Sequence, residues 1–208
     1  MTEHIYTYIN PPSEKHLEKA CKLLSNDGVL VYPMGNNWSL GCDAGNVRAI
    51  DRIWKLKPTH PKERPFTLIC NNISMASTVG NIDSNLYRIL KKVWPGPFTI
   101  IVKRNRSLPR QIKDKRHVVG IRIPDSPLVL HLVEKYGFPL ATTSVPLKPD
   151  ETPYRSGYEI YDSIGHGIDL LLDLGEELPG LESTIFDCSE GEPVLIREGS
   201  GDPGLFKA

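Results

Sequence analysis

Two arginines stand inside apolar, strand-like runs of this 208-residue chain: Arg122 in VVGIRIP and Arg197 in PVLIREG. A guanidinium in such a run must pair with an anion or face a cavity, because an unpaired buried charge is costly. Two interpretations stay open for each arginine. It forms a structural salt bridge, or it is a fixed planar fork that binds a carboxylate or a phosphate.

Hydroxyl side chains end or open two further apolar runs. Thr142 and Ser144 close the run that begins FPLA, and Ser183 opens STIFD after a glycine-containing loop. Such clusters suit the binding of a phosphate or an amino acid through short hydrogen bonds. Taken singly, the same residues also serve as caps of strand ends.

A basic segment, KLKPTHPKERP at residues 55–65, is the third chemical feature. Its Lys57 and Arg64 make it a candidate clamp for a polyphosphate, with a solvated surface loop as the alternative. The chain has no GxxxxGK[ST] motif, and no GxGxxG follows a strand. A nucleotide would therefore be bound without the common phosphate loops.

Composition narrows the class of protein. The 25 basic and 25 acidic residues balance, which argues against a generic polyanion binder. No apolar run approaches the ~20 residues of a membrane span, and the first residues lack the pattern of a secretory signal. The four cysteines are far apart and form no CxxC pair, so we expect free thiols, a cytoplasmic protein and no metal site: Cys21, Cys42, Cys70 and Cys188.

Helical and strand patterns alternate over the first two-thirds of the chain. Helices are predicted after Ser13, Asp83 and Ser126, and at 47–54 and 158–164. Strands are predicted at 29–32, 66–70, 98–102, 118–123, 140–144 and 168–174, and the runs STIFDC and PVLIRE predict a terminal hairpin. The order predicts an α/β fold with a mixed sheet, and the absence of a long linker predicts one domain over residues 1–208.

The segment from Gly28 to Ala44, GVLVYPMGNNWSLGCDA, stands out within this pattern. A predicted strand ends in an uncharged loop from Met34 to Ser39. A Gly-Cys-Asp-Ala turn and then a helix are predicted to follow this loop. Open α/β sheets bind ligands where strands end in such loops, so this loop is predicted to line a site.

Several motifs in order resemble the YrdC/YciO family, which holds the L-threonylcarbamoyladenylate synthases. They are YP…LGCDA, the segment ending in RPFTLIC, WPGPFTIIVK, VGIRIP, TTS, ESTIFD and LIREG, and they cover roughly residues 10–200. The resemblance implies a twisted mixed parallel/antiparallel sheet around a large concave cavity. It also implies that L-threonine and bicarbonate form N-carboxythreonine, whose carboxylate attacks the α-phosphate of ATP. The products are threonylcarbamoyl-AMP and pyrophosphate, with Mg²⁺ on the phosphates, and the carbamoyl group later reaches a tRNA adenosine.

The resemblance also implies roles for single residues. The nucleotide and its phosphates would contact Lys57, Arg64, Ser144 and Arg197. The amino acid would contact Arg122, Thr142 and Ser183, with the Arg122 guanidinium on the threonine carboxylate. These assignments fit the chemistry, since adenylation is catalysed mostly by positioning and by neutralising phosphate charge.

The chain departs from the family in its loops. The family's PTDTVYGLG reads PMGNNWSLG here, so Met34, Gly35 and Asn36 replace Thr, Asp and Thr. Thr59 stands at the arginine of the KxR motif, and Pro146 at the asparagine of TSAN. The pattern is nearer the YciO branch of the family.

Two alternative functions stay open beside a synthase. One is a module that binds double-stranded RNA, a tRNA or the ribosome through the concave surface, although strong non-specific binding usually needs excess positive charge. The other is an ATP-binding relative with a different acyl substrate, since Met34 would make the amino-acid pocket more apolar.

Overall fold

The computed structural model describes residues 2–8, 11–57, 66–105 and 117–206. Its helices are α1 (Glu14–Leu24), α2 (Val47–Leu56), α3 (Ile73–Val79), α4 (Ser84–Val93), α5 (Pro127–Tyr136) and α6 (Gly157–Ile164). Its strands are β1 (Glu3–Tyr6), β2 (Leu30–Pro33), β3 (Trp38–Asp43), β4 (Thr67–Ile69), β5 (Phe98–Lys103), β6 (Val118–Arg122), β7 (Leu140–Ser144), β8 (Leu170–Asp173), β9 (Thr184–Asp187) and β10 (Val194–Arg197).

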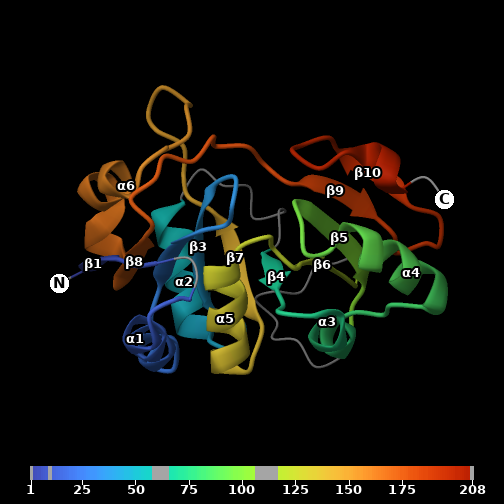
Figure 1. Ribbon diagram of the computed structural model, residues 1–208, viewed down its shortest axis with the longest axis horizontal. Coiled ribbons are helices and arrows are strands. Elements are labelled where there is room, and N and C mark those ends of the chain that lie inside the picture. Colours follow the sequence, from blue (N-terminus) through green and yellow to red (C-terminus); the bar gives the residue numbers. More distant parts are fainter. Residues whose placement is uncertain (1, 9–10, 58–65, 106–116, 207–208) are drawn as a thin grey trace.

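These strands form one mixed sheet in the order β1-β8-β2-β3-β7-β4-β6-β5-β9-β10 (Figure 1). The sheet contains parallel pairs such as β4–β6 and β5–β9 and antiparallel pairs such as β3–β7 and β5–β6. The α/β class, the mixed sheet and the terminal β9–β10 hairpin confirm the sequence predictions. None of the described helices is long and apolar enough to cross a membrane.

The predicted Gly-Cys-Asp-Ala turn is wrong, because most of it belongs to strand β3. Strands β2 and β3 form an antiparallel hairpin, with Leu30 opposite Gly41 and Pro33 opposite Trp38. The loop is therefore only residues 34–37. Apolar residues at alternate positions, Trp38, Leu40 and Cys42, are buried in the core and account for the strand. Strand β1 and helix α3 were likewise not predicted from the sequence.

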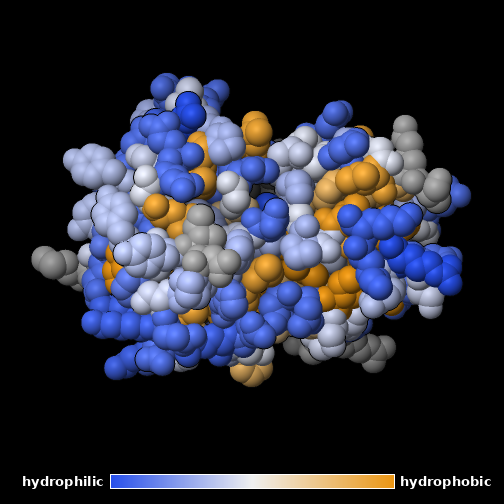
Figure 2. Space-filling view, viewed as in Figure 1, coloured by the Kyte–Doolittle hydropathy of each residue, from blue (hydrophilic) through white to orange (hydrophobic). Residues whose placement is uncertain are grey.

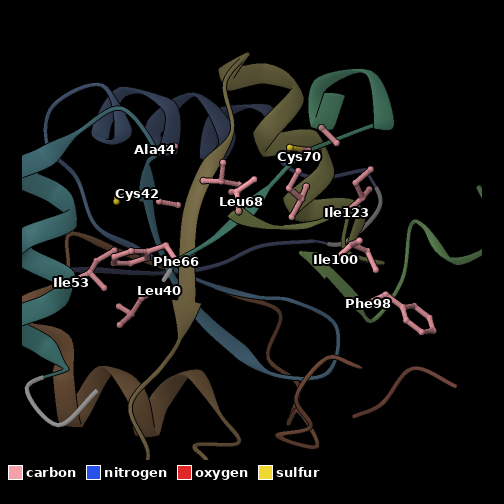
Figure 3. Packing of buried hydrophobic residues seen from close by; sticks show 14 of the residues in the cluster. Leu40, Cys42, Ala44, Ile53, Phe66, Leu68, Cys70, Phe98, Ile100 and Ile123 are labelled. Carbon is pink, nitrogen blue, oxygen red and sulfur yellow. The ribbon is translucent and has the colours of Figure 1, made fainter. Parts of the chain in front are cut away.

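The sheet separates two apolar clusters. Figure 3 shows the larger one, to which Leu40, Leu68 and Ile100 contribute from strands β3, β4 and β5. The smaller cluster lies on the opposite face and packs against α1 and α5, which are joined by the ion pair of Lys135 with Glu14. Since side chains alternate along a strand, each strand contributes to both faces.

Helices begin after Ser13, Asp83 and Ser126 as predicted, but Asp83 alone of these three residues caps its helix with its side chain; Ser13 forms no such cap. Asp83 caps α4 as expected, because its carboxylate accepts from the Leu86 amide. Ser126 precedes α5 but forms no side-chain cap. Its hydroxyl donates instead to the carbonyl of Pro33 at 3.1 Å, and this bond fixes the start of α5 beside the 34–37 loop.

Candidate active site

Small polar side chains gather on the sheet face that also carries the smaller apolar cluster. Ser39 of β3 lies opposite Ser144 of β7, and Thr142 pairs with Thr67 of β4. Thr67 in turn lies opposite Gly120, next to the Thr99 side chain. The apolar part of this face lies under α1 and α5, whereas the polar part is not covered by them. Figure 2 shows the surface hollowed between the two halves of the molecule.

Lys57 lies at one end of this polar face. It directly follows α2, and its side chain is buried, with 7% of the residue exposed. This burial differs from the solvated surface loop that was one of the two interpretations of the basic segment. Its ammonium group donates to the Ser144 carbonyl at 2.7 Å, to the Thr143 hydroxyl at 3.0 Å and to the Ser144 hydroxyl at 3.3 Å. Two residues predicted to bind phosphate, Lys57 and Ser144, are thus brought together. Arg64 and Thr59 lie outside the described residues.

Arg122 ends β6 on the same face and is 7% exposed. Its Nη2 donates to the Met34 carbonyl at 3.2 Å, while its Nε is buried and has no hydrogen-bond partner among the described residues. No described carboxylate lies within ion-pair distance of it, so the structural salt bridge is absent there. Burial, and after it the charge of Arg197, lowers the pKa of Arg122 to about 10. Such a cation is stabilised by an anionic ligand.

Arg197 and Ser183 form a second basic cluster close to Arg122. The Arg197 guanidinium donates to the Ser183 carbonyl from Nη2 at 2.8 Å and from Nε at 3.1 Å, and to the Ser183 hydroxyl at 3.3 Å. It also forms an ion pair with the carboxylate of Glu182. Of the two interpretations given for this arginine, the structural salt bridge is therefore present. The Ser183 hydroxyl shares a 2.8 Å hydrogen bond with Thr99.

The loop of residues 34–37 links these clusters. Gly35 has a φ of +88°, which an L side chain rarely adopts, and a Cβ there would come within 3.1 Å of the Asp125 carbonyl. The Asn36 carbonyl accepts from the amides of Gly180 and Leu181 at 2.8 and 3.0 Å, and its side chain donates to the Ser200 hydroxyl at 2.8 Å. The loop therefore reaches from Arg122 to the segment that holds Ser183 and Arg197.

The side chains of Met34 and Thr142 are used inside the fold. Met34 is 1% exposed and packs in the cluster beside α5, so its thioether does not line the polar face. The Thr142 hydroxyl donates to the Leu40 carbonyl at 2.7 Å and accepts from the Tyr32 hydroxyl at 3.2 Å. The role of Thr142 toward an amino acid stays a prediction.

Cysteines and acidic groups supply little further chemistry. Cys42 and Cys70 are buried, and burial raises the pKa of each thiol to about 12, which fits packing residues rather than nucleophiles. Within the described residues, no group of three His, Cys, Asp or Glu side chains is arranged to hold a metal ion. A separate open cavity of about 430 Å³ lies between the 148–154 segment and α6, away from the polar face.

Sequence reasoning missed several members of this face. Asn37 and Ser39 were predicted to line a site only as members of the Met34–Ser39 loop and were given no role of their own, and Thr99 was not singled out, because it stands alone between apolar residues. The available signal was alternation: within β3 and β5, every second residue is apolar and buried in the larger cluster, so the residues between must face the other side.

Comparison with known proteins identifies the family of this chain. A family model for Sua5, YciO and YrdC, described as "Telomere recombination", matches residues 22–199. YciO from Escherichia coli is 31% identical over 99% of the chain and all of its own length. Its crystal structure superposes with a TM-score of 0.92, covering 99% of this chain and 100% of that one. The chain belongs to the Sua5/YciO/YrdC family, and its likeness to YciO extends over the full length of both proteins.

More distant relatives have a named activity. A threonylcarbamoyl-AMP synthase from Bacillus subtilis is 29% identical over 90% of this chain and 54% of its own length. The crystal structure of Sua5 from Pyrococcus abyssi with L-threonine is 25% identical, with a TM-score of 0.85 over 95% of this chain and 58% of that chain. This chain thus spans a little over half the length of those synthases.

Proposed function

We propose that the protein is a threonylcarbamoyl-AMP synthase-type nucleotidyltransferase, which adenylates an N-carboxy amino acid with ATP. The observation that carries the proposal is Arg122: a guanidinium that is 7% exposed, with an unpartnered Nε and no carboxylate partner among the described residues. A buried cation that has no anionic partner in the described part of the chain suggests a site for an anionic ligand. The named activity of the more distant relatives supports the same reaction.

The arrangement of the side chains fits the reaction in two parts. Arg122 would hold the carboxylate of the amino acid, near the cluster of Ser183 and Arg197. Lys57 and Ser144 would contact the phosphates of ATP across the polar face. Small hydroxyls between these groups leave room for the substrates and provide hydrogen bonds. The protein would then act by positioning the carbamate oxygen in line with the α-phosphorus and by neutralising the charge of the departing pyrophosphate.

The residues described at this site do not supply a metal site of their own. Glu182 is the carboxylate beside the basic groups, and it pairs with Arg197. Mg²⁺ in proteins is bound through carboxylates together with substrate phosphates. We therefore assign Mg²⁺ to the phosphate oxygens of ATP, as part of the substrate, and derive no step through a protein-bound ion.

Pyrophosphate release tests the proposal. Purified protein is incubated with ATP, Mg²⁺ and bicarbonate, with and without L-threonine, and pyrophosphate is measured. We expect threonine-dependent release in the wild type, a loss of at least about 100-fold in Arg122→Ala, and full activity in the matched control Arg88→Ala, whose side chain is exposed on α4. Full turnover in Arg122→Ala would refute the carboxylate clamp.

The alternative functions appear as distinct outcomes of the same assay. Absence of ATP turnover and of ATP binding, together with salt-sensitive binding of duplex RNA, would replace the synthase by an RNA-binding module. Release stimulated by an amino acid other than threonine would identify a relative with a different acyl substrate. Met34 is buried in the smaller apolar cluster, which weakens the argument that its side chain makes the amino-acid pocket more apolar.

A further inference from the structure

We propose that the open cavity between the 148–154 segment and α6 binds the guanidinium group of an arginine side chain on a protein partner. The inference concerns a surface apart from the candidate active site, and it does not depend on the proposed function. Helix α6 packs against β8, toward the end of the sheet opposite β10 (Figure 1). The cavity has a volume of about 430 Å³, which is within the range of ligand-binding sites.

Helix α6 presents an aromatic ring and a carboxylate to the cavity. Tyr158 and Asp162 both line it, and they are four residues apart on the helix, so their side chains are neighbours on its surface. The Tyr158 residue is 67% exposed. The Asp162 carboxylate forms no ion pair or hydrogen bond with any described residue. The ring and the carboxylate are therefore both available to one ligand.

The other side of the cavity already holds one cation. The Lys148 ammonium lies 5.6 Å from the centroid of the Tyr154 ring, a cation–π contact, and 2.6 Å from a carboxylate oxygen of Glu159. This ion pair neutralises the one basic side chain among the described residues that line the cavity. Two further carboxylates line it, Asp150 and Asp162, so the cavity keeps an excess of negative charge.

This pair of partners, a ring and a carboxylate, favours a guanidinium over other cations. The guanidinium is planar, so it stacks on an aromatic face while its N–H groups donate to a carboxylate in the same plane. Tyr158 and Asp162 offer these two contacts at adjacent positions of one helix. A metal ion fits less well, since no group of three His, Cys, Asp or Glu side chains within the described residues is arranged to hold one.

The charge of the surrounding chain favours a protein side chain over free arginine. Residues 148–177 contain eight acidic and two basic residues, although the whole chain is balanced. Free arginine carries an α-carboxylate, which this acidic surrounding repels. A peptide presents the same side chain on a neutral backbone, and further basic residues of the partner would be attracted by the same field.

A titration followed by NMR tests the proposal on the full chain. The probe is the peptide acetyl-Ala-Arg-Ala-amide, and its controls are free L-arginine and the same peptide with citrulline, whose uncharged urea group has the shape of a guanidinium. We expect saturable shifts at the residues that line the cavity with the arginine peptide. The Kd values of both controls are expected to be higher by at least about fivefold.

Variants identify the two contacts. Asp162→Asn and Tyr158→Leu are each expected to raise the Kd of the arginine peptide by at least about threefold. The control Asp51→Asn removes the same charge from an exposed position of α2 and is expected to leave the Kd unchanged. All three positions are at the surface, so the fold should be preserved, and the NMR spectrum of each variant verifies this directly.

Each outcome supports or overturns the inference. Weaker binding in both variants, with citrulline discriminated against, supports it. Absence of saturable binding, equal binding of the arginine and citrulline peptides, or an unchanged Kd in the two variants overturns it. Free L-arginine binding as tightly as the peptide would overturn the protein partner in favour of a small molecule. No substrate of the proposed reaction is present in this titration, so its failure leaves the proposed function standing.

Discussion

Replacement of Arg122 by methionine separates a functional arginine from a structural one. In the folded protein the pKa of Arg122 is lowered from its ordinary value to about 10, chiefly through burial. A shift of this size corresponds to about 3 kcal/mol of unfavourable free energy for the charged form. The cost is present in full below pH 10, since the depressed pKa of a base penalises its protonated state. Against it stands one charge-assisted hydrogen bond to the Met34 carbonyl, worth about 1.5–3 kcal/mol. We therefore expect Arg122→Met to be as stable as the wild type or up to about 2 kcal/mol more stable.

Urea unfolding at neutral pH measures this difference, and Arg52→Met provides the contrast. The Arg52 guanidinium donates to both carboxylate oxygens of Asp169, at 2.7 and 3.1 Å, and to the carbonyl of Asp27 at 2.8 Å. It is a structural arginine in a partly exposed ion pair, so its replacement is expected to lower the free energy of unfolding by about 1–3 kcal/mol. The same substitution thus has opposite expected effects at the two positions.

Activity completes the comparison. Arg122→Met is expected to lose threonine-dependent pyrophosphate release while it keeps its stability, which is the behaviour of a residue held for function. A loss of more than about 2 kcal/mol in Arg122→Met, comparable with the effect at Arg52, would refute the reasoning. It would mean that the folded protein itself neutralises the Arg122 charge.

Three further predictions concern other parts of the chain. Lys57→Met removes the ammonium group beside Ser144, so the KM for ATP is expected to rise about tenfold or more, with a smaller change in the KM for threonine; equal changes in both constants would contradict a phosphate role. Burial raises the pKa of Cys42 and Cys70 to about 12, so at pH 8 neither thiol is expected to react with a disulfide reagent until denaturant is added. The pKa of Glu159 is lowered from 4.5 to about 2, first by the hydrogen bond from Lys148, so its carboxylate stabilises the fold above pH 4.5. The stability difference between wild type and Glu159→Gln should therefore shrink as pH falls from 4.5 to 2, and a constant difference would exclude this contribution.

The fold was predictable from the sequence wherever the period of the apolar residues was unambiguous. The stripe of Leu17, Ala20 and Leu24 gave α1, and the boundaries of β7 at Leu140 and Ser144 were predicted to the residue. The β2–β3 hairpin was misread because Gly41 suggested a turn. In the fold, Gly41 lies in a strand where a Cβ would collide with the Tyr32 side chain, so its small size serves a close approach rather than a turn.

The order in which strands pair in the sheet determines which polar side chains lie next to one another. This order cannot be predicted from the sequence of any single strand. Arg122 and Arg197 were recognised as unusual because they stand in apolar runs. Arg122 has an Nε without a partner among the described residues, whereas Arg197 forms an ion pair with Glu182, and this difference depends on the neighbours that the sheet order brings to each arginine. The Met34–Ser39 loop was predicted to line a site, but that the side-chain oxygen of Asn37 lacks a partner among the described residues is visible only in three dimensions.

The most direct test of the account is detection of the product. Wild-type protein and Arg122→Met are incubated with ATP, Mg²⁺, L-threonine and ¹³C-bicarbonate, with the threonylcarbamoyl-AMP synthase of Bacillus subtilis as positive control, and the nucleotides are analysed by mass spectrometry. The account predicts ¹³C-labelled threonylcarbamoyl-AMP from the wild type and none from Arg122→Met. Equal product from both proteins, or no acyl-AMP from the wild type under conditions in which the positive control is active, would contradict it.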